Sequence, residues 1–305
     1  MFVQKTDLVS QARTSKKLPN FIWAIILALI FMFCGQFLGG LVTYPLIKSL
    51  EKTNFFVENK EIIVLLITLL SFMFTSLVVF FRVSKIEKRK ISTIGFYKDK
   101  WLKKYAIGFL IGLAMMSVVV LILFILGYIE LEKKPIQPVG ISAIVSVLIV
   151  LIGWIVQGGT EEVLTRGWLM NMLGARYNIT FGLILSSVFF GLLHLGNPNI
   201  SYIAILNIIL VGIFFGICVT KTNNLWIACG MHSAWNFAQG NLFGFEVSGI
   251  NVQVGSLVDL NLVGNDLITG GIFGPEAGLA STFVLACGIL IVFILDKKGY
   301  FLKNK

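Results

Sequence analysis

The chain has 305 residues, of which 57% are hydrophobic and 13% are charged. Soluble domains are closer to half apolar and a quarter charged, so this composition excludes an ordinary soluble protein and indicates an all-α polytopic membrane protein. The formal net charge is +10, but the basic residues gather beside apolar runs without interleaved aromatic side chains, so we expect no nucleic-acid partner.

Eight apolar runs are candidates for transmembrane helices, because a span needs about 20 apolar residues. In chain order they cover 21–44, 62–81, 105–128, 141–173, 181–195, 203–220, 225–239 and 277–295. Pro45 predicts the end of the first run. The loop that precedes the last run, 240–276, is expected to be an ordinary connection with short extended pieces.

We expect one integrated bundle of about eight transmembrane helices with three regions. An N-terminal region, 1–140, holds three helices and a basic cytoplasmic loop. A central region, 141–240, holds the candidate catalytic helices. The last region, 241–305, holds the outer loop, the last span and a basic tail.

The basic residues are divided unequally between the two sides of this bundle. With the N-terminus in the cytoplasm, 20 of the 25 Lys and Arg residues lie on the cytoplasmic side, and the basic loop 82–104 alone holds nine. This division obeys the positive-inside rule, so we expect both termini to be cytoplasmic. The basic loop also suits anionic lipid headgroups. The Lys-, Ile- and Asn-leaning composition favours a bacterial cytoplasmic membrane.

Ionisable side chains inside apolar runs indicate function, because each costs at least about 2.5–3.5 kcal/mol by insertion scales. The only two histidines, His194 and His232, lie in such sequence. The only carboxylates deep inside an apolar run are Glu161 and Glu162. These residues belong to three segments, G-G-T-E-E-V-L-T-R, F-G-L-L-H and H-S-A-W-N.

Helix geometry predicts that the three segments meet. If residues 174–178 form a turn, Glu161 and His194 lie about 20–24 Å along adjacent antiparallel helices. His232 lies about 12 Å from its own turn, so all three meet if the first hairpin projects about 10 Å beyond the membrane. We expect a site in the cytoplasmic half of the bilayer, bordered by residues 196–201; the alternative for 196–201 is a plain outer loop.

Spacing along the helices suggests a role for each residue. Glu162 and Arg166 are four apart and suit an ion pair, while Glu161 is rotated by about 100° and is left to face a cavity as a general base or acid. His232 and Asn236 share a helix face and could donate hydrogen bonds to an oxyanion, worth about 3–4 kcal/mol per donor. The alternative for these pairs is a purely structural role in joining helices.

The motifs E-E-x-x-x-R, F-x-x-x-H and H-x-x-x-N, in this order on separate spans, resemble the CPBP family of intramembrane proteases. This family is also called the CAAX-protease and bacteriocin-processing, or ABI, family, and includes type II CAAX prenyl endopeptidases and lysostaphin-resistance-like proteins. The resemblance covers about 153–236, and 270–281 also resembles a late segment of bacterial members. It implies that Glu161 activates water beside His194, that Glu162 and Arg166 complete the first motif, and that His232 and Asn236 stabilise an oxyanion.

The resemblance leaves the cofactor open. It implies either a metal-free glutamate mechanism or a metalloprotease, in which Glu161, His194 and His232 would be three zinc ligands with one open position. The H-E-x-x-H zinc motif is absent from the sequence.

We expect an intramembrane endopeptidase that hydrolyses a peptide bond in a hydrophobic or membrane-associated peptide or protein, such as a bacteriocin precursor. The alternative is a non-catalytic membrane immunity factor or scaffold of the same fold. A proton-coupled transporter is disfavoured, because the sequence shows no internal repeat.

Overall fold

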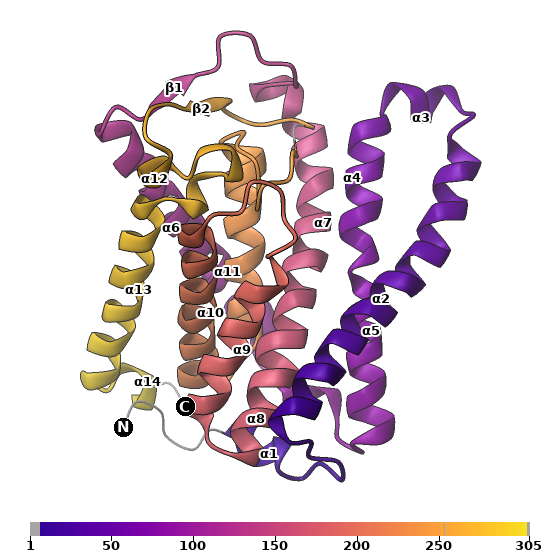
Figure 1. Cartoon of the computed structure of the whole chain (residues 1–305), viewed down its shortest axis with the longest axis vertical. Helices are drawn as coiled ribbons and strands as arrows, with labels where there is room; N and C mark the ends of the chain where they lie inside the picture. Colours follow the sequence, from indigo (N-terminus) through magenta and orange to yellow (C-terminus); the bar gives the residue numbers. More distant parts are fainter. Residues whose placement is uncertain (1–6, 253, 304–305) are drawn as a thin grey trace.

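The computed structural model describes residues 7–252 and 254–303. Helices make up most of this part of the chain, and a two-stranded sheet covers one end of the bundle (Figure 1). The α-helices are α1 (Asp7–Ala12), α2 (Phe21–Leu50), α3 (Asn54–Glu58), α4 (Lys60–Ser71), α5 (Met73–Phe81), α6 (Trp101–Ile125), α7 (Ile144–Glu162), α8 (Met170–Arg176), α9 (Ile179–Leu193), α10 (Tyr202–Thr222), α11 (Trp226–Phe237), α12 (Asp266–Thr269), α13 (Leu279–Lys297) and α14 (Tyr300–Lys303).

Shorter elements complete the chain. Three π-helical segments extend α5, α7 and α11, and four 3₁₀ turns lie in the loops. The π-helical segments are Arg82–Ile86, Val163–Leu169 and Ala238–Leu242; the 3₁₀ turns are Ile91–Ile94, Gly140–Ala143, Gly271–Phe273 and Pro275–Ala277. The strands β1 (Ile129–Leu131) and β2 (Leu260–Leu262) pair antiparallel, with Glu130 opposite Asn261. The predicted outer loop therefore does contain a short extended piece.

Six helical stretches of the described residues are long and apolar enough to cross a membrane, which supports a multi-pass membrane protein. They are Phe21–Leu50, Lys60–Ile86, Trp101–Ile125, Gly140–Arg176, Tyr202–Thr222 and Leu279–Lys297. The other two predicted runs are also helical, but α9 has 15 residues and α11 has 12. The all-α fold class is thus confirmed, whereas the count of eight spans is not.

The first helix is longer than its sequence predicts. Pro45 lies inside α2, which continues to Leu50, so the predicted stop at Pro45 is wrong. A proline removes only one hydrogen bond of the helical ladder, and membrane helices tolerate such a break.

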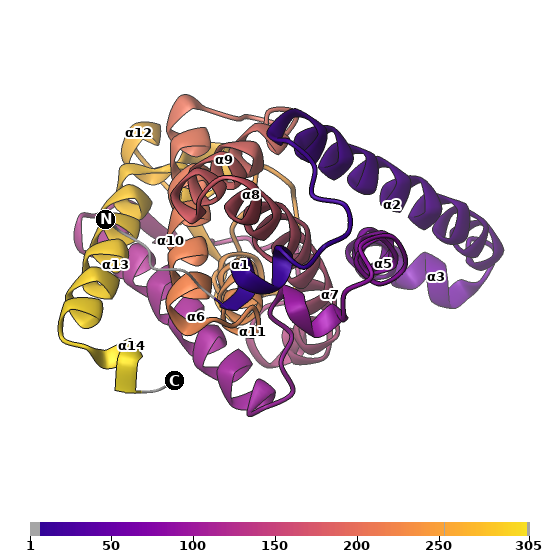
Figure 2. The same cartoon turned by 90° about the horizontal axis from the view of Figure 1, so that it is seen from below.

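The helices form a main bundle with an arm beside it. Figures 1 and 2 show α2, α3, α4 and α5 on one side of the molecule, and α6, α10, α11 and α13 on the other, with α7 and α9 between them. The described ends of the chain, α1 and α14, lie at the same end of the bundle, opposite β1, β2 and α12 (Figure 1). The candidate site lies where α7, α9 and α11 meet.

Local sequence explains how these three helices are placed. Asn178 caps α9 by accepting a hydrogen bond from the backbone N–H of Phe181 at 2.9 Å. The turn before α9 is shorter than the predicted 174–178, because α8 continues to Arg176 and only residues 177 and 178 are non-helical. Helix α11 lies so close to α6 that a Cβ atom at Gly112 would collide with the backbone carbonyl of Met231. Such close contact at glycine residues is typical of helices in membrane bundles. Because His232 follows Met231 in the chain, this contact also fixes the backbone position of His232.

Candidate active site

Glu162 is the most enclosed charged group of the site. Its side chain is fully buried, and Oε1 accepts hydrogen bonds from Nη1 of Arg166 at 2.8 Å and from Nδ1 of His232 at 3.0 Å. The predicted Glu162–Arg166 ion pair is therefore present. Its charge is neutralised in place, so Glu162 serves to hold α7, the π-helical segment after it and α11 together.

Arg166 lies in the π-helical segment that directly follows Glu162. Its guanidinium carbon is 4.4 Å from the ring centroid of Phe190 and 5.8 Å from that of Phe215, which places the cation over two aromatic faces. These contacts join α9 and α10 to the same cluster. The Glu162–Arg166 pair thus connects five elements: α7, the π-helical segment, α9, α10 and α11.

Glu161 faces the other way, as its rotation along the helix predicts. Oε1 accepts a hydrogen bond from Nε2 of Gln157 at 2.8 Å, and Oε2 lies 3.5 Å from Nε2 of His232. The side chain is 20% exposed, in contrast to Glu162. Two neighbouring carboxylates therefore have different environments, one sealed in an ion pair and one open to a cavity.

His232 connects the two carboxylates, because each ring nitrogen faces one of them. His194, at the end of α9, is held differently: its Nδ1 lies 2.8 Å from the backbone carbonyl of Phe190. A carbonyl oxygen can only accept, so this Nδ1 carries the proton and Nε2 keeps a free lone pair. Asn236 donates through Nδ2 to Oε1 of Gln157 at 3.0 Å.

These side chains line two cavities that share several residues. A narrow cavity of about 40 Å³ has Glu161, His194, His232 and Asn236 in its wall. A larger cavity of about 310 Å³ shares Glu161, His194 and Asn236 with it and extends between α7 and α9 on one side and α2, α4 and α5 on the other. The larger cavity is mostly apolar. Asn197 lines it, so the segment 196–201 borders the cavity as predicted.

Polar residues outside the predicted motifs close the narrow cavity. Glu276 accepts hydrogen bonds through Oε1 from the backbone N–H of Ser248 at 2.6 Å and from Gln239 at 3.2 Å, and Asn207 donates to the Glu276 carbonyl at 2.8 Å. The polar residues outside the motifs that line this cavity are Gln157, Asn207, Ser248 and Glu276. A signal for Gln157 exists in the sequence, since it lies four residues before Glu161, whereas Ser248 and Glu276 come from a loop whose folding over the site has no periodic signal.

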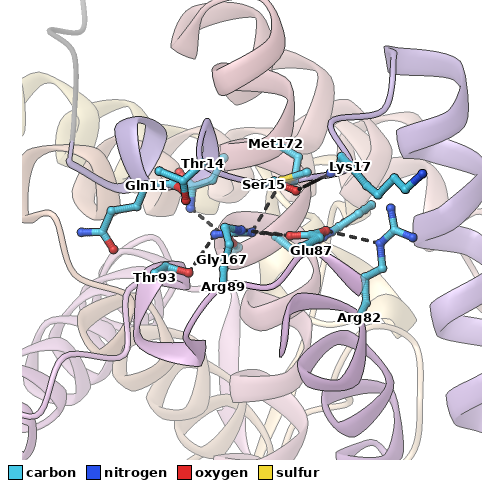
Figure 3. Close-up of polar contacts among 12 residues, drawn as sticks. Gln11, Thr14, Ser15, Lys17, Arg82, Glu87, Arg89, Thr93, Gly167 and Met172 are labelled. Atoms are coloured by element: carbon cyan, nitrogen blue, oxygen red, sulfur yellow. Dashed lines mark hydrogen bonds and ion pairs between the residues drawn. The ribbon is translucent and has the colours of Figure 1, made fainter. Parts of the chain in front are cut away.

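A second buried charge cluster lies at the end of the bundle that holds α1 and α14. Glu87, from the basic loop, is fully buried and accepts hydrogen bonds from Nη2 of Arg89 at 2.6 Å and from Nε of Arg82 at 3.3 Å (Figure 3). Its Oε1 also accepts from the indole N–H of Trp168 at 2.8 Å. Since Trp168 belongs to the same π-helical segment as Arg166, this cluster attaches the basic loop to the site.

The arrangement of the three candidate zinc ligands bears on whether they could share a metal ion. No group of three or more His, Cys, Asp or Glu side chains is arranged to hold a metal ion within 7–252 and 254–303. Glu161 and His232 face each other, but Nδ1 of His232 is held by Glu162 and Nδ1 of His194 by a backbone carbonyl. Zinc binding by Glu161, His194 and His232 stays a prediction.

Comparison with known proteins gives one result. Residues 143–238 match the family model described as type II CAAX prenyl endopeptidase Rce1-like. Comparison with curated proteins and with solved structures gives no match. The matched region contains all six predicted site residues, including both carboxylates of α7. The resemblance seen in the motifs is thereby confirmed: residues 143–238 are similar to the type II CAAX prenyl endopeptidase Rce1-like family.

Proposed function

We propose that the protein is an intramembrane endopeptidase that hydrolyses a peptide bond in a hydrophobic or membrane-associated peptide, using water activated by Glu161 and His194. One observation supports this most: Glu161 and His194, from two different helices, line the same cavity, while the charge of Glu162 is taken up by Arg166. A carboxylate that is open to a small cavity and is not paired with a lysine or arginine is available as a base.

Glu161 takes the proton from the attacking water. His194 positions that water, because its Nδ1–H is donated to Phe190 and its Nε2 lone pair can accept a hydrogen bond from the water. The resulting hydroxide attacks the carbonyl carbon of the scissile peptide bond. General acid–base catalysis of this kind accelerates a reaction about 10²–10⁴-fold.

His232 and Asn236 hold the oxyanion that this attack creates. Protonated on both ring nitrogens, His232 keeps its Nδ1–H on Glu162 and donates from Nε2, the nitrogen that faces Glu161, and Asn236 donates from its amide. Glu161 then gives its proton to the nitrogen of the leaving amine, and the C–N bond breaks. The carboxylate is thereby regenerated as a base.

The larger cavity supports a hydrophobic substrate. Its wall is mostly apolar, and it shares Glu161 and His194 with the narrow cavity. A peptide with apolar side chains beside the scissile bond would gain the free energy of burying them there, about 25 cal/mol per Å² of apolar surface. The apolar wall therefore supports a hydrophobic peptide as the substrate class.

The substitution Glu161→Gln tests the proposal. It removes the base and keeps the size of the side chain, so cleavage of a hydrophobic peptide in detergent or proteoliposomes should fall at least about 10²-fold. Glu130→Gln, an exposed carboxylate on β1, should leave cleavage unchanged. Wild-type rates in Glu161→Gln would contradict the enzyme and favour the alternative, a membrane immunity factor or scaffold whose phenotype survives alanine at Glu161, His194 and His232.

A further inference from the structure

Gln157 lies between two of the candidate catalytic residues, although it belongs to none of the three motifs. It precedes Glu161 by one helical turn on α7 and is 8% exposed. Its Nε2 donates to Oε1 of Glu161 at 2.8 Å, and its Oε1 accepts from Nδ2 of Asn236 on α11 at 3.0 Å. A continuous chain of hydrogen bonds thus joins the candidate base to a candidate oxyanion donor.

The chemistry of the three groups fixes the direction of this chain. An ionised carboxylate only accepts hydrogen bonds, so Gln157 must turn its NH₂ group toward Glu161. The carbonyl of Gln157 then faces Asn236, which must present its own NH₂ group. Reversing the Gln157 amide would place its oxygen against the carboxylate of Glu161. Reversing the Asn236 amide would place its oxygen against the carbonyl oxygen of Gln157.

This direction decides what Asn236 offers the cavity. An asparagine NH₂ group has two hydrogens, and Gln157 takes only one of them. The second remains for a substrate oxyanion. Without Gln157, the Asn236 amide could rotate and place its carbonyl oxygen where a donor is required.

We propose that Gln157 is a positioning residue that sets the amide orientation of Asn236 and holds the carboxylate of Glu161, so that both act on one substrate carbonyl. The inference rests on the proposed peptidase function. Gln157 needs no contact with the reacting atoms, because it acts through the two residues that it joins. Its effect therefore belongs to the chemical step and not to substrate binding.

The substitution Gln157→Leu removes both hydrogen bonds and keeps the side chain's bulk. We expect kcat to fall about 10–100-fold with KM changed less than about twofold, since loss of a single oxyanion donor costs about 10²–10³ in kcat and Asn236 keeps part of its donor capacity. Peptide cleavage by the full chain in detergent micelles gives both constants.

The chain contains a matched control for the structural cost of this change. Gln137 is 6% exposed and likewise bridges two partners: its Nε2 donates to Oδ1 of Asp259 at 2.7 Å, and its Oε1 accepts from the backbone N–H of Gly255 at 2.9 Å. Gln137 lines neither the narrow cavity nor the larger one. Gln137→Leu should lower the melting temperature by an amount similar to Gln157→Leu and leave kcat unchanged.

A double-mutant cycle separates positioning from a general loss of packing. If Gln157 acts through Asn236, the combined variant with Asn236→Ala should lose less activity than the product of the two single losses. Gln157→Met, an unbranched side chain of similar length, serves as the second variant and should reproduce the low kcat even if Gln157→Leu unfolds.

Three results would overturn the inference. These are a kcat within about twofold of wild type in Gln157→Met, an effect confined to KM, or fully multiplicative losses in the cycle. Failure of this inference is distinct from failure of the peptidase function. The inference alone fails if wild type cleaves, Glu161→Gln does not, and Gln157→Met is normal; both fail if wild type cleaves no peptide.

Discussion

Arg166 neutralises the buried charge of Glu162 at the site. It is fully buried and pairs with the equally buried Glu162, which also accepts from His232. A buried ion pair gives little net stability compared with apolar residues, but removal of one partner leaves an uncompensated charge in a low-dielectric environment. The loss of stability on removing Arg166 therefore comes mainly from the buried Glu162 carboxylate, which is left unpaired.

Arg166→Met should consequently lower the free energy of unfolding by about 3–5 kcal/mol and reduce activity. The double variant Arg166→Met with Glu162→Gln should recover part of the lost stability, because the unpaired charge is gone. Thermal unfolding in detergent measures both. Lys48→Met, which removes one partner of an exposed ion pair with Glu51, should barely shift the melting temperature. A double variant no more stable than Arg166→Met would contradict this account.

At the scale of single residues, spacing predicted part of the site. The four-residue interval between Glu162 and Arg166 predicts their ion pair. The rotation of about 100° between neighbouring residues of a helix predicts that Glu161 faces a cavity. Spacing could not predict that His232 faces both carboxylates, because that depends on the relative rotation of α7 and α11 about their axes. The role of each residue in catalysis stays a prediction.

The π-helical segment Val163–Leu169 is the element on which the site depends. It directly follows the two carboxylates, carries Arg166, and is held from outside by the hydrogen bond from Trp168 to Glu87. π-helical turns are rare and occur frequently at functional sites, because their wider turn displaces side chains that an α-helix would align. Glu87 thus helps to fix the position of Arg166 from the opposite side of the segment.

Trp168→Phe tests this connection, since it removes the indole N–H and keeps an aromatic ring against Phe31, whose ring centroid is 4.8 Å away. We expect a loss of about 1.5–3 kcal/mol in the free energy of unfolding, the range for a hydrogen bond to a charged group, and a severalfold lower kcat. The matched control is Trp226→Phe, which loses a hydrogen bond of 3.1 Å to the neutral carbonyl of Tyr97. Equal losses in both variants would show that Glu87 does not hold the segment.

At the scale of elements, the length of the apolar runs located the long helices of the described residues but not where each one ends. Residues 82–104 have a strongly basic composition, so they were predicted as a cytoplasmic loop, and composition cannot show that Glu87 within it is buried by Arg82, Arg89 and Trp168. The continuation of α2 through Pro45 was missed because local propensity does not count the membrane's strong preference for hydrogen-bonded backbone.

The basic segments that the sequence analysis assigned to opposite sides of the membrane lie at opposite ends of the bundle. The loop after α5, the turn between α8 and α9, and α14 lie at the end of the bundle that also holds α1, whereas α3 and β1 lie at the opposite end (Figure 1). The five Lys residues counted outside flank α3 or follow β1; they are Lys48, Lys52, Lys60, Lys133 and Lys134. The fold therefore keeps the charge asymmetry on which the predicted orientation depends.

This asymmetry gives a prediction for the orientation in the membrane. Because positive charge near the ends of spans is retained in the cytoplasm, the end with α1 and α14 should be cytoplasmic and the end with β1 should face outward. Single cysteines at two exposed lysines, Lys133→Cys near β1 and Lys298→Cys after α13, report the two ends. The background needs Cys34→Ala and Cys287→Ala, since Cys218 and Cys229 are buried. A membrane-impermeant maleimide should label the first position in intact cells and the second only after permeabilisation, and the reverse pattern would contradict the orientation.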